Sequence, residues 1–98
     1  MHHFLILINY SVPFEKIAPT LPEHREHLQR QVDAGVILLS GPRNPRTGGL
    51  IIARANSEEQ IRKMIADDPY KRDNLAEYEL IEFNPGKHQS FLADWIAV

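Results

Sequence analysis

The order in which strand-like and helix-like segments follow one another is the feature that most constrains how this chain can fold. Four segments have the branched, aromatic or alternating character of strands: residues 3–9, 36–42, 50–55 and 76–83. Two segments place apolar residues at helical spacing, residues 20–35 and residues 57–68. The segments therefore follow the order strand, helix, strand, strand, helix, strand.

This order predicts an α+β fold of the ferredoxin-like βαββαβ type. Such a fold builds an antiparallel sheet and lays both helices on one of its faces. Residues 43–49 carry Pro45 and the pair Gly48 and Gly49, as expected for a loop that joins the two middle strands in a hairpin. A chain of 98 residues has room for one core, so we expect a single domain, residues 1–98.

Residue types typical of helix ends mark the limits of both helices. Thr20 followed by Glu23 matches a capping box, and Gly35 is expected to end the first helix. Ser57 is expected to begin the second helix. Pro69 should end it, because a proline disfavours helical dihedrals in the residue before it.

The composition excludes several classes of protein. A net charge of −2 gives no sign of the positive charge that nucleic-acid binding requires, and the apolar run of residues 4–8 is far too short to span a bilayer. The chain has no cysteine, so it can form neither a disulfide nor a thiolate metal site, and we expect a cytoplasmic protein. We also expect no bound cofactor.

His24 interrupts the apolar side of the first helix. It lies three residues after Leu21 and four before Leu28, so it should point toward the core. By the same spacing His27 should be angled away, and Arg25 should lie on another face of the helix. An inward histidine is more often a hydrogen-bonded core residue than a catalytic one, so this position alone leaves both roles open.

Asp68 supplies a partner for His24. It follows Ile65 by three residues, which places it on the side of the second helix that should face the sheet. In the ferredoxin-like order the start of the first helix and the end of the second lie at the same end of the sheet. We therefore expect the two side chains to converge, in a pair suited to general acid–base catalysis. The alternative for Asp68 is to brace the turn before Pro69, and Asp67 is expected to face solvent.

Four further side chains are expected near this pair as candidates for binding a substrate: Ser40, Arg43, Arg46 and Tyr70. The two arginines could attract an anionic substrate, although arginines in loops more often serve solubility. Ser40 lacks the surrounding sequence of a nucleophile. The alternative for Tyr70 is to anchor the turn by packing its ring under the sheet.

A metal site formed by Glu23, His24 and His27 is disfavoured. Histidines that bind zinc from one helix favour a spacing of four residues, whereas these two are three residues apart. We therefore expect no metal ligands in this chain.

These motifs together resemble the YciI-like family, small dimeric proteins of the ferredoxin-like, dimeric α+β barrel type. The likeness covers most of the chain and is carried by PEHREHL around His24, LLSGP ending at Pro42, ADDPY with Asp68, and AEYELIEF. It implies that His24 and Asp68 are the paired residues regarded as the family's active-site dyad. One branch of the family eliminates chloride from chlorinated hydroxyhydroquinones. The resemblance thus implies a lyase or dehydrochlorinase acting on a small polar or hydroxylated aromatic.

The last predicted strand indicates that the chain associates with itself. Tyr78 and Leu80 alternate with Ile81 and Phe83, so both faces of the sheet carry apolar side chains while the helices cover only one. We expect a homodimer joined through the sheet faces. Residues 86–98 carry aromatic and aliphatic side chains at amphipathic spacing and should form a C-terminal arm that docks on the domain or on a partner.

The sequence leaves two alternatives to an enzyme. One is a noncatalytic homodimer that binds a metabolite in the same cavity. The other is an accessory domain that regulates a neighbouring enzyme through its sheet edge or its C-terminal arm.

Overall fold

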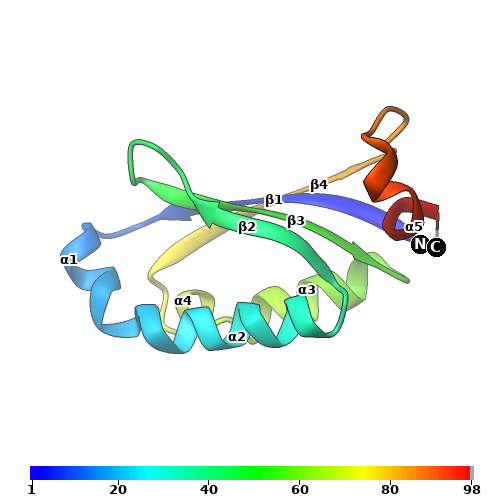
Figure 1. Cartoon of the computed structure of the whole chain (residues 1–98). Coiled ribbons are helices and arrows are strands. Elements are labelled where there is room, and N and C mark those ends of the chain that lie inside the picture. Colours follow the sequence, from blue (N-terminus) through cyan, green and yellow to red (C-terminus); the bar gives the residue numbers. More distant parts are fainter. Residues whose placement is uncertain (98) are drawn as a thin grey trace.

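The computed structural model describes residues 1–97 and contains one four-stranded antiparallel sheet (Figure 1). β1 (His2–Tyr10) and β3 (Gly48–Ala55) lie in its centre, and β2 (Ile37–Pro42) and β4 (Ala76–Phe83) form its edges, in the order β2-β3-β1-β4. The strands follow the sequence predictions closely. The ferredoxin-like α+β fold class is confirmed.

Helices cover one face of this sheet (Figure 1). They are α2 (Leu21–Asp33), α3 (Glu58–Ala66) and the short α4 (Pro69–Arg72). The chain enters α2 through α1 (Phe14–Ile17) and η1 (Ala18–Thr20), and it ends with η2 (Ser90–Leu92) and α5 (Ala93–Ala97) near the N-terminus. None of the helices within residues 1–97 has the length and apolar character needed to cross a membrane.

The core lies between the sheet and the helices. Phe4, Ile6 and Ile8, alternate residues of β1, point to the helix layer and are almost completely buried. Ile51 of β3 pairs with Ile6 and joins the same core, as does Ile61 of α3. Because burying one such side chain contributes roughly 1.5–3 kcal/mol, this layer is what holds the helices on the sheet.

The start of α2 differs from the predicted capping box. η1 runs directly into α2, and the backbone of Thr20 is itself helical, so the Thr20 side chain makes no capping hydrogen bond. The amide of Leu21 donates to the carbonyl of Ala18 instead. Glu23 is left to pair with Arg72 at 2.6 Å, which joins α2 to α4.

Gly35 ends the first helix, as predicted. Its φ of +78° lies in the left-handed region, which glycine adopts without steric cost. The amide of Val36 donates to the carbonyl of Gln31, and the amide of Gly35 donates to the carbonyl of Val32, each at 3.0 Å. This is the Schellman arrangement that closes a helix before a sharp change of direction, here into β2.

The second helix begins as predicted and is followed by a helix that was not predicted. The hydroxyl of Ser57 accepts a hydrogen bond from the amide of Gln60 at 3.2 Å. α3 ends at Ala66, and Asp68 then caps α4 with Pro69 in its first turn. An aspartate followed by a proline is typical of the start of a helix. The same two residues that predict the end of α3 therefore also predict the beginning of α4.

The expected outward direction of His27 is wrong. His27 is buried, and its Nε2 donates a hydrogen bond to the carbonyl oxygen of Met64 in α3 at 2.8 Å. α2 is flanked by α3 as well as by the sheet, so its buried side is broader than one apolar stripe. Val32, which the spacing places in that stripe, is exposed instead.

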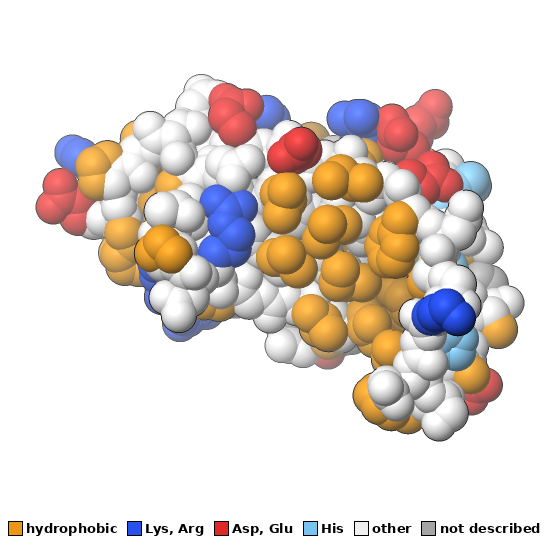
Figure 2. Space-filling model, turned by 90° about the horizontal axis from the view of Figure 1, so that it is seen from above, with side chains coloured by type: hydrophobic (Ala, Val, Ile, Leu, Met, Phe, Trp, Pro, Cys, Tyr) orange, Lys and Arg blue, Asp and Glu red, His pale blue; other side chains and the backbone are white. Residues whose placement is uncertain are grey.

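The other face of the sheet carries apolar side chains that no helix within residues 1–97 covers, except at the end where Trp95 of α5 packs against His3 and Arg54. They are seen as the central orange area of Figure 2. By the strand register this open face consists of Leu5, Leu7, Leu39, Leu50, Ile52, Ile81 and Phe83. Three of these are well exposed: Leu39 at 54%, Ile81 at 41% and Phe83 at 37%. A sheet with apolar side chains on both faces needs a second covering layer.

The C-terminal arm packs on its own chain at the far end of the sheet. The Nη1 of Arg54 donates to the carbonyl of Trp95 at 2.7 Å, and the Arg54 guanidinium lies 5.0 Å from the centre of the Trp95 ring. The Trp95 and His3 rings are 5.4 Å apart. Phe91 stays exposed, and Val98, the last residue of the predicted arm, lies outside the described residues.

Gly48 offers a test of how tightly the strands fit. A Cβ at this position would overlap the carbonyl oxygen of Ile8, so Gly48→Ala should lower the free energy of unfolding by about 3 kcal/mol or more. Gly41→Ala is the matched control, because a Cβ there meets nothing within 4 Å, and it should change stability by less than about 1 kcal/mol. Urea unfolding of both variants measures the difference. Equal losses would contradict the close approach at Gly48.

Candidate active site

His24 and Asp68 meet within hydrogen-bond distance although 44 positions separate them in the sequence. His24 lies near the start of α2, and Asp68 lies between α3 and α4. The imidazole Nδ1 is 2.9 Å from the carboxylate Oδ1, and the residues are only 7% and 1% exposed, respectively. Removing either partner would leave a buried polar group unsatisfied, so the contact constrains how the two helices pack.

The surroundings of Asp68 determine which imidazole nitrogen carries the hydrogen. Oδ1 of Asp68 accepts from the amide of Tyr70 at 3.0 Å, as the N-cap of α4, and also faces Nδ1 of His24. A carboxylate only accepts hydrogen bonds, so Nδ1 of His24 must be the donor. In the neutral ring the lone pair is then on Nε2, the nitrogen that remains available to a substrate.

Two tyrosine rings fix the plane of the imidazole. The ring of Tyr70 stacks on that of His24 with centroids 3.8 Å apart and planes 7° apart. Tyr10, from the end of β1, meets Tyr70 edge to face at 6.1 Å. Because Tyr70 follows Asp68 by two residues, the same short segment holds His24 by a hydrogen bond and by stacking. The ring is therefore pre-organised rather than free to turn.

The Tyr70 hydroxyl is buried and has no hydrogen-bond partner among the described residues. Burial raises the pKa of Tyr70 well above its usual value of 10.0, and Tyr10 and Asp68 act in the same direction. The phenol is therefore neutral at physiological pH, and its hydrogen is available to an acceptor that enters the site.

The charge of Asp68 also acts on a tyrosine of the sheet. Tyr78 of β4 is largely buried, and its hydroxyl makes no hydrogen bond of good geometry within residues 1–97. Burial, and after it the charge of Asp68, raises the pKa of Tyr78. Tyr70 and Tyr78 are therefore neutral phenols near the carboxylate of Asp68. The ionisable side chain that is hydrogen-bonded to this carboxylate is the imidazole of His24.

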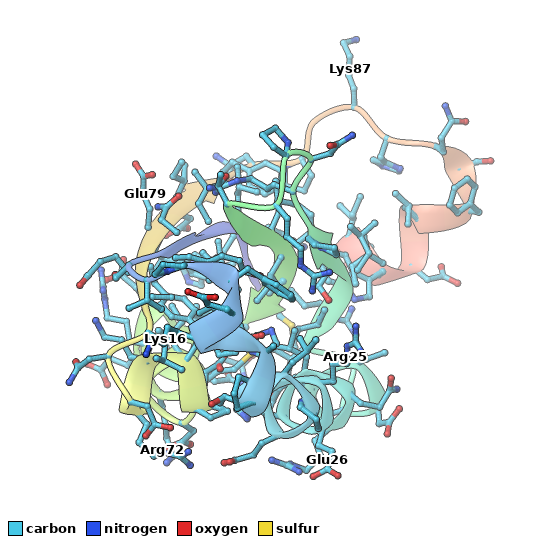
Figure 3. The ribbon with its side chains drawn as sticks, turned by 90° about the vertical axis from the view of Figure 1, so that its left-hand side faces the viewer. Lys16, Arg25, Glu26, Arg72, Glu79 and Lys87 are labelled. Atoms are coloured by element: carbon cyan, nitrogen blue, oxygen red, sulfur yellow. The ribbon has the colours of Figure 1, made fainter. Side chains whose placement is uncertain are left out.

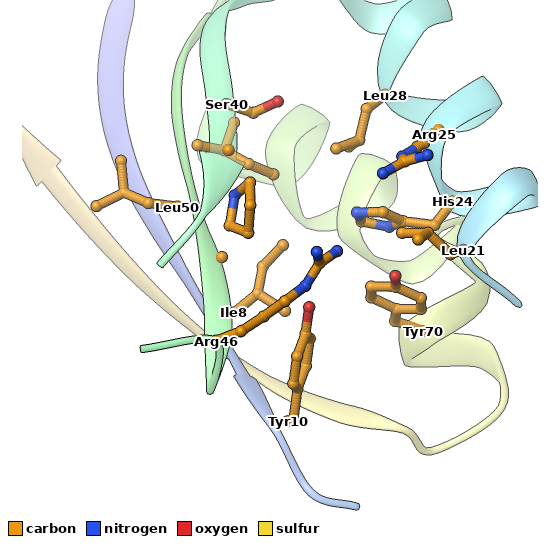
Figure 4. Close-up of a pocket in the computed structure, with 14 residues that line it drawn as sticks. Ile8, Tyr10, Leu21, His24, Arg25, Leu28, Ser40, Arg46, Leu50 and Tyr70 are labelled. Atoms are coloured by element: carbon orange, nitrogen blue, oxygen red, sulfur yellow. The ribbon is translucent and has the colours of Figure 1, made fainter. Parts of the chain in front are cut away.

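A cavity of about 190 Å³ lies beside His24 and Tyr70, between α2 and the β2–β3 hairpin (Figure 4). Its apolar lining residues are Ile8, Leu21, Leu28, Pro42, Leu50 and Ile51, with Gly41 and Gly49. Its polar lining residues are Tyr10, His24, Arg25, Ser40, Arg46 and Tyr70. The cavity thus combines aliphatic surface with a group of hydrogen-bonding side chains, as small-molecule sites do.

The structure brings three of the four predicted binding residues to this cavity. Ser40, Arg46 and Tyr70 line it, whereas Arg43 does not. Nη2 of Arg43 instead donates to Oγ1 of Thr47 at 3.3 Å, within the hairpin loop. The direction of a loop side chain depends on the path of the loop, which composition does not determine.

Two polar lining residues were not among the predicted candidates. Tyr10 ends β1 at the cavity, and Arg25 follows His24 on α2. Figure 3 shows Glu26 projecting from the side of α2 that faces away from the sheet, and Arg25 nearer the sheet. Arg25 lies four residues after Leu21, a spacing that puts both on the same side of a helix, so a signal for Arg25 was present.

Within the described residues, no three or more His, Cys, Asp or Glu side chains are grouped so that they could hold a metal ion. The side chains considered for such a site have other partners. Glu23 pairs with Arg72, and His27 donates to the carbonyl of Met64.

Comparison with known proteins connects this geometry to a family. Residues 2–84 match the family model described as the YCII-related domain. The derivative of benzaldehyde biosynthesis cluster protein C from Emericella nidulans is 36% identical over 64 residues. That alignment covers 54% of this chain and 65% of the relative, which is slightly less than two thirds of the relative's length.

A solved structure shares the fold. It is 5-chloro-2-hydroxyhydroquinone dehydrochlorinase from Burkholderia phenoliruptrix AC1100, in complex with 2,5-dihydroxybenzoquinone. The TM-score is 0.73 and the sequence identity 18%, over 91% of this chain and 97% of that one. At this identity the similarity shows a common fold and does not transfer a reaction.

A comparison of Asp68 with its neighbour Asp67 tests the two contacts of Asp68, one with His24 and one with the amide of Tyr70. Asp68→Ala removes the partner of His24 and the cap of α4 together, and should lower the free energy of unfolding by about 3 kcal/mol. Asp67→Ala removes an exposed ion pair, in which Oδ2 lies 3.3 Å from Nζ of Lys63, and should cost less than about 0.5 kcal/mol. Guanidinium unfolding compares them. Two small, equal changes would show that Asp68 makes no such contacts.

Proposed function

The chain belongs to the YCII-related domain family, and from this membership and the geometry of the site we propose that it is an enzyme acting on a small polar or hydroxylated aromatic compound. His24 is its general acid–base, and Asp68 is the partner that orients it. The observation that carries the proposal is the 2.9 Å contact between these side chains at the wall of a cavity. A cytoplasmic location stays a prediction from the composition.

The geometry supports a proton transfer through Nε2 of His24. This nitrogen takes a proton from a substrate hydroxyl, and the resulting imidazolium is stabilised by Asp68 through Nδ1. The electron pair of the O–H bond moves into the ring. If the ring carries a halide and a second hydroxyl, the imidazolium returns the proton to the carbon that bears the halide, which becomes tetrahedral. The second hydroxyl then loses its proton to Nε2, and its electron pair moves through the ring and expels the halide, so that a quinone forms and one proton and one halide are lost in total. Without a leaving group, the proton returns to another ring atom and the product is an isomer.

Two comparisons support this class of substrate. The structural neighbour is by its name a dehydrochlorinase of a hydroxylated aromatic, and it holds a dihydroxybenzoquinone. The Emericella nidulans relative is by its name a protein of a biosynthesis cluster for a benzaldehyde derivative. Both names concern molecules built on one six-membered ring, which agrees with a cavity of about 190 Å³.

The acid–base role is tested by turnover of a defined panel. We expect chlorinated hydroxyhydroquinones to release chloride, or unchlorinated ones to exchange ring hydrogen for deuterium in D₂O, both followed by NMR. His24→Gln should lower kcat about 10²–10⁴-fold, the contribution typical of a positioned general base. Asp68→Asn should lower kcat about 10–100-fold, because it disturbs the orientation of the imidazole.

His88→Gln is the control for this experiment, since His88 is exposed and contacts the carbonyl of the adjacent Gln89. Its kcat should equal that of the wild type. Unchanged turnover in His24→Gln would reject the acid–base role. Binding of the panel without any turnover would instead favour the noncatalytic metabolite-binding module.

We further propose that a second copy of the chain covers the open face. That face carries exposed aliphatic and aromatic side chains on both edge strands, with the apolar side chains of β1 and β3 between them, so water contact is unfavourable over a contiguous area. A self-complementary sheet face produces a two-fold symmetric dimer. The cavity lies mainly on the helix side of the sheet, opposite the open face. The contact between His24 and Asp68 forms within one copy of the chain and does not depend on the second copy.

Sedimentation velocity tests this association. The wild type should sediment as a dimer at micromolar concentration, and Ile81→Lys should shift it to monomer because a charge would be buried in the interface. Val32→Lys is the matched control, because Val32 has a similar exposure, 38% against 41%, on the helix layer. It should leave the dimer intact. A monomeric wild type, or equal dissociation by both variants, would contradict the proposal.

A further inference from the structure

The cavity wall carries positive charge without a matching negative charge. Arg25 of α2 and Arg46 of the β2–β3 loop both line the cavity, and no aspartate or glutamate within residues 1–97 does. Among the described residues neither guanidinium has a hydrogen bond or an ion pair, and the contact recorded for Arg46 is with the ring of Phe14 at 4.3 Å. On the outer surface, in contrast, Arg62 and Arg72 are paired with glutamates.

Asp68 does not satisfy these arginines. Its hydrogen bonds go to His24 and to the amide of Tyr70, and it is not a lining residue of the cavity. A guanidinium presents five N–H donors in a planar fork that matches the geometry of a carboxylate or a similar oxyanion. Two unpaired guanidiniums beside a largely aliphatic wall therefore favour an anionic ligand over a neutral one.

The Tyr70 hydroxyl gives a second, independent indication that the ligand carries a hydrogen-bond acceptor. It is buried, it has no acceptor among the described residues, and burial keeps it protonated by raising its pKa. In Figure 4 the side chains of Arg25, Arg46, Tyr70 and Tyr10 converge on one space beside His24. These four groups are donors, or can act as donors, while Nε2 of His24 is the lone-pair acceptor of the neutral imidazole.

The size and walls of the cavity limit the rest of the ligand. A volume of about 190 Å³ is close to the engineered cavity of roughly 150 Å³ that holds one benzene molecule. Ile8, Leu28 and Ile51 supply aliphatic surface to the same cavity. One ring with a few small polar substituents fits this description.

We propose that the cavity binds a monocyclic organic acid by its oxyanion. The carboxylate or ionised enol oxygens lie between Arg25 and Arg46 and accept the hydrogen of the Tyr70 hydroxyl. A hydroxyl group on the same ring faces Nε2 of His24. The placement of that hydroxyl rests on the proposed function, whereas binding of the oxyanion does not.

Isothermal titration calorimetry with two matched probes tests the oxyanion contact. 4-Hydroxybenzoate and 4-hydroxybenzamide have nearly the same shape and differ in charge. The wild type should bind the acid at least about 10-fold more tightly than the amide, because charge-assisted hydrogen bonds are stronger than neutral ones. Arg25→Gln and Arg46→Gln should each weaken acid binding about 10-fold and leave amide binding within about 2-fold.

Arg43→Gln is the matched control for Arg46→Gln. Arg43 lies in the same loop and its substitution changes the net charge equally, yet it does not line the cavity. Acid binding by this variant should stay within about 2-fold of the wild type. Tyr70→Phe keeps the ring that stacks on His24 and removes only the hydroxyl, so it should weaken acid binding about 3–10-fold. Circular dichroism verifies that each variant is folded.

His24→Gln separates this inference from the proposed function. It should bind 4-hydroxybenzoate within about 3-fold of the wild type, because the oxyanion contacts remain, while the proton-transfer activity is lost. A wild type that prefers the acid but turns over no substrate would reject only the enzyme proposal. Equal affinity for acid and amide, no measurable binding of the acid, or an equal loss in Arg43→Gln and Arg46→Gln would overturn the oxyanion site.

Discussion

The hydrogen bond between His24 and Asp68 is the interaction on which the functional end of this molecule depends. Oδ1 of Asp68 holds the imidazole of α2 and caps α4 at the same time. α4 in turn supplies Tyr70, whose ring stacks on His24. Two helices, α2 and α4, are therefore fixed by one buried carboxylate, and the cavity beside them takes its shape from that arrangement. An unpaired carboxylate at 1% exposure would be strongly destabilising, so the contact with His24 contributes to the stability of this end of the molecule.

Much of the fold follows from the sequence because strand and helix periodicities are strong along this chain. The order of elements determines which helix end lies near which strand end. It therefore predicts from the sequence alone that Asp68 lies near His24. The details that were missed depend on neighbours in space. His27 is buried because α3 lies beside α2, and Thr20 needs no capping box because η1 precedes it. The spacing of apolar residues within one helix predicts neither of these two features.

The residues of the cavity also divide into those that the sequence predicts and those that depend on neighbours in space. Residues of regular elements could be placed, since Ser40 lies on an edge strand and Tyr70 follows Asp68 by two residues. The loop residues Arg43 and Arg46 are chemically equivalent in the sequence, and only the path of the hairpin separates them. Arg25 is the instructive case, because helical spacing from Leu21 puts it on the cavity side although its charge suggests a solvent-facing position.

We expect Asp68 to hold the hydrogen of His24 on Nδ1 and to leave Nε2 free to accept a proton. Long-range ¹H–¹⁵N NMR of the folded protein reports which nitrogen of each neutral histidine is protonated. The account predicts the Nδ1–H tautomer for His24, with His27 as an internal reference in the opposite Nε2–H form because it donates to the carbonyl of Met64. A spectrum in which His24 is protonated on Nε2 would contradict the account.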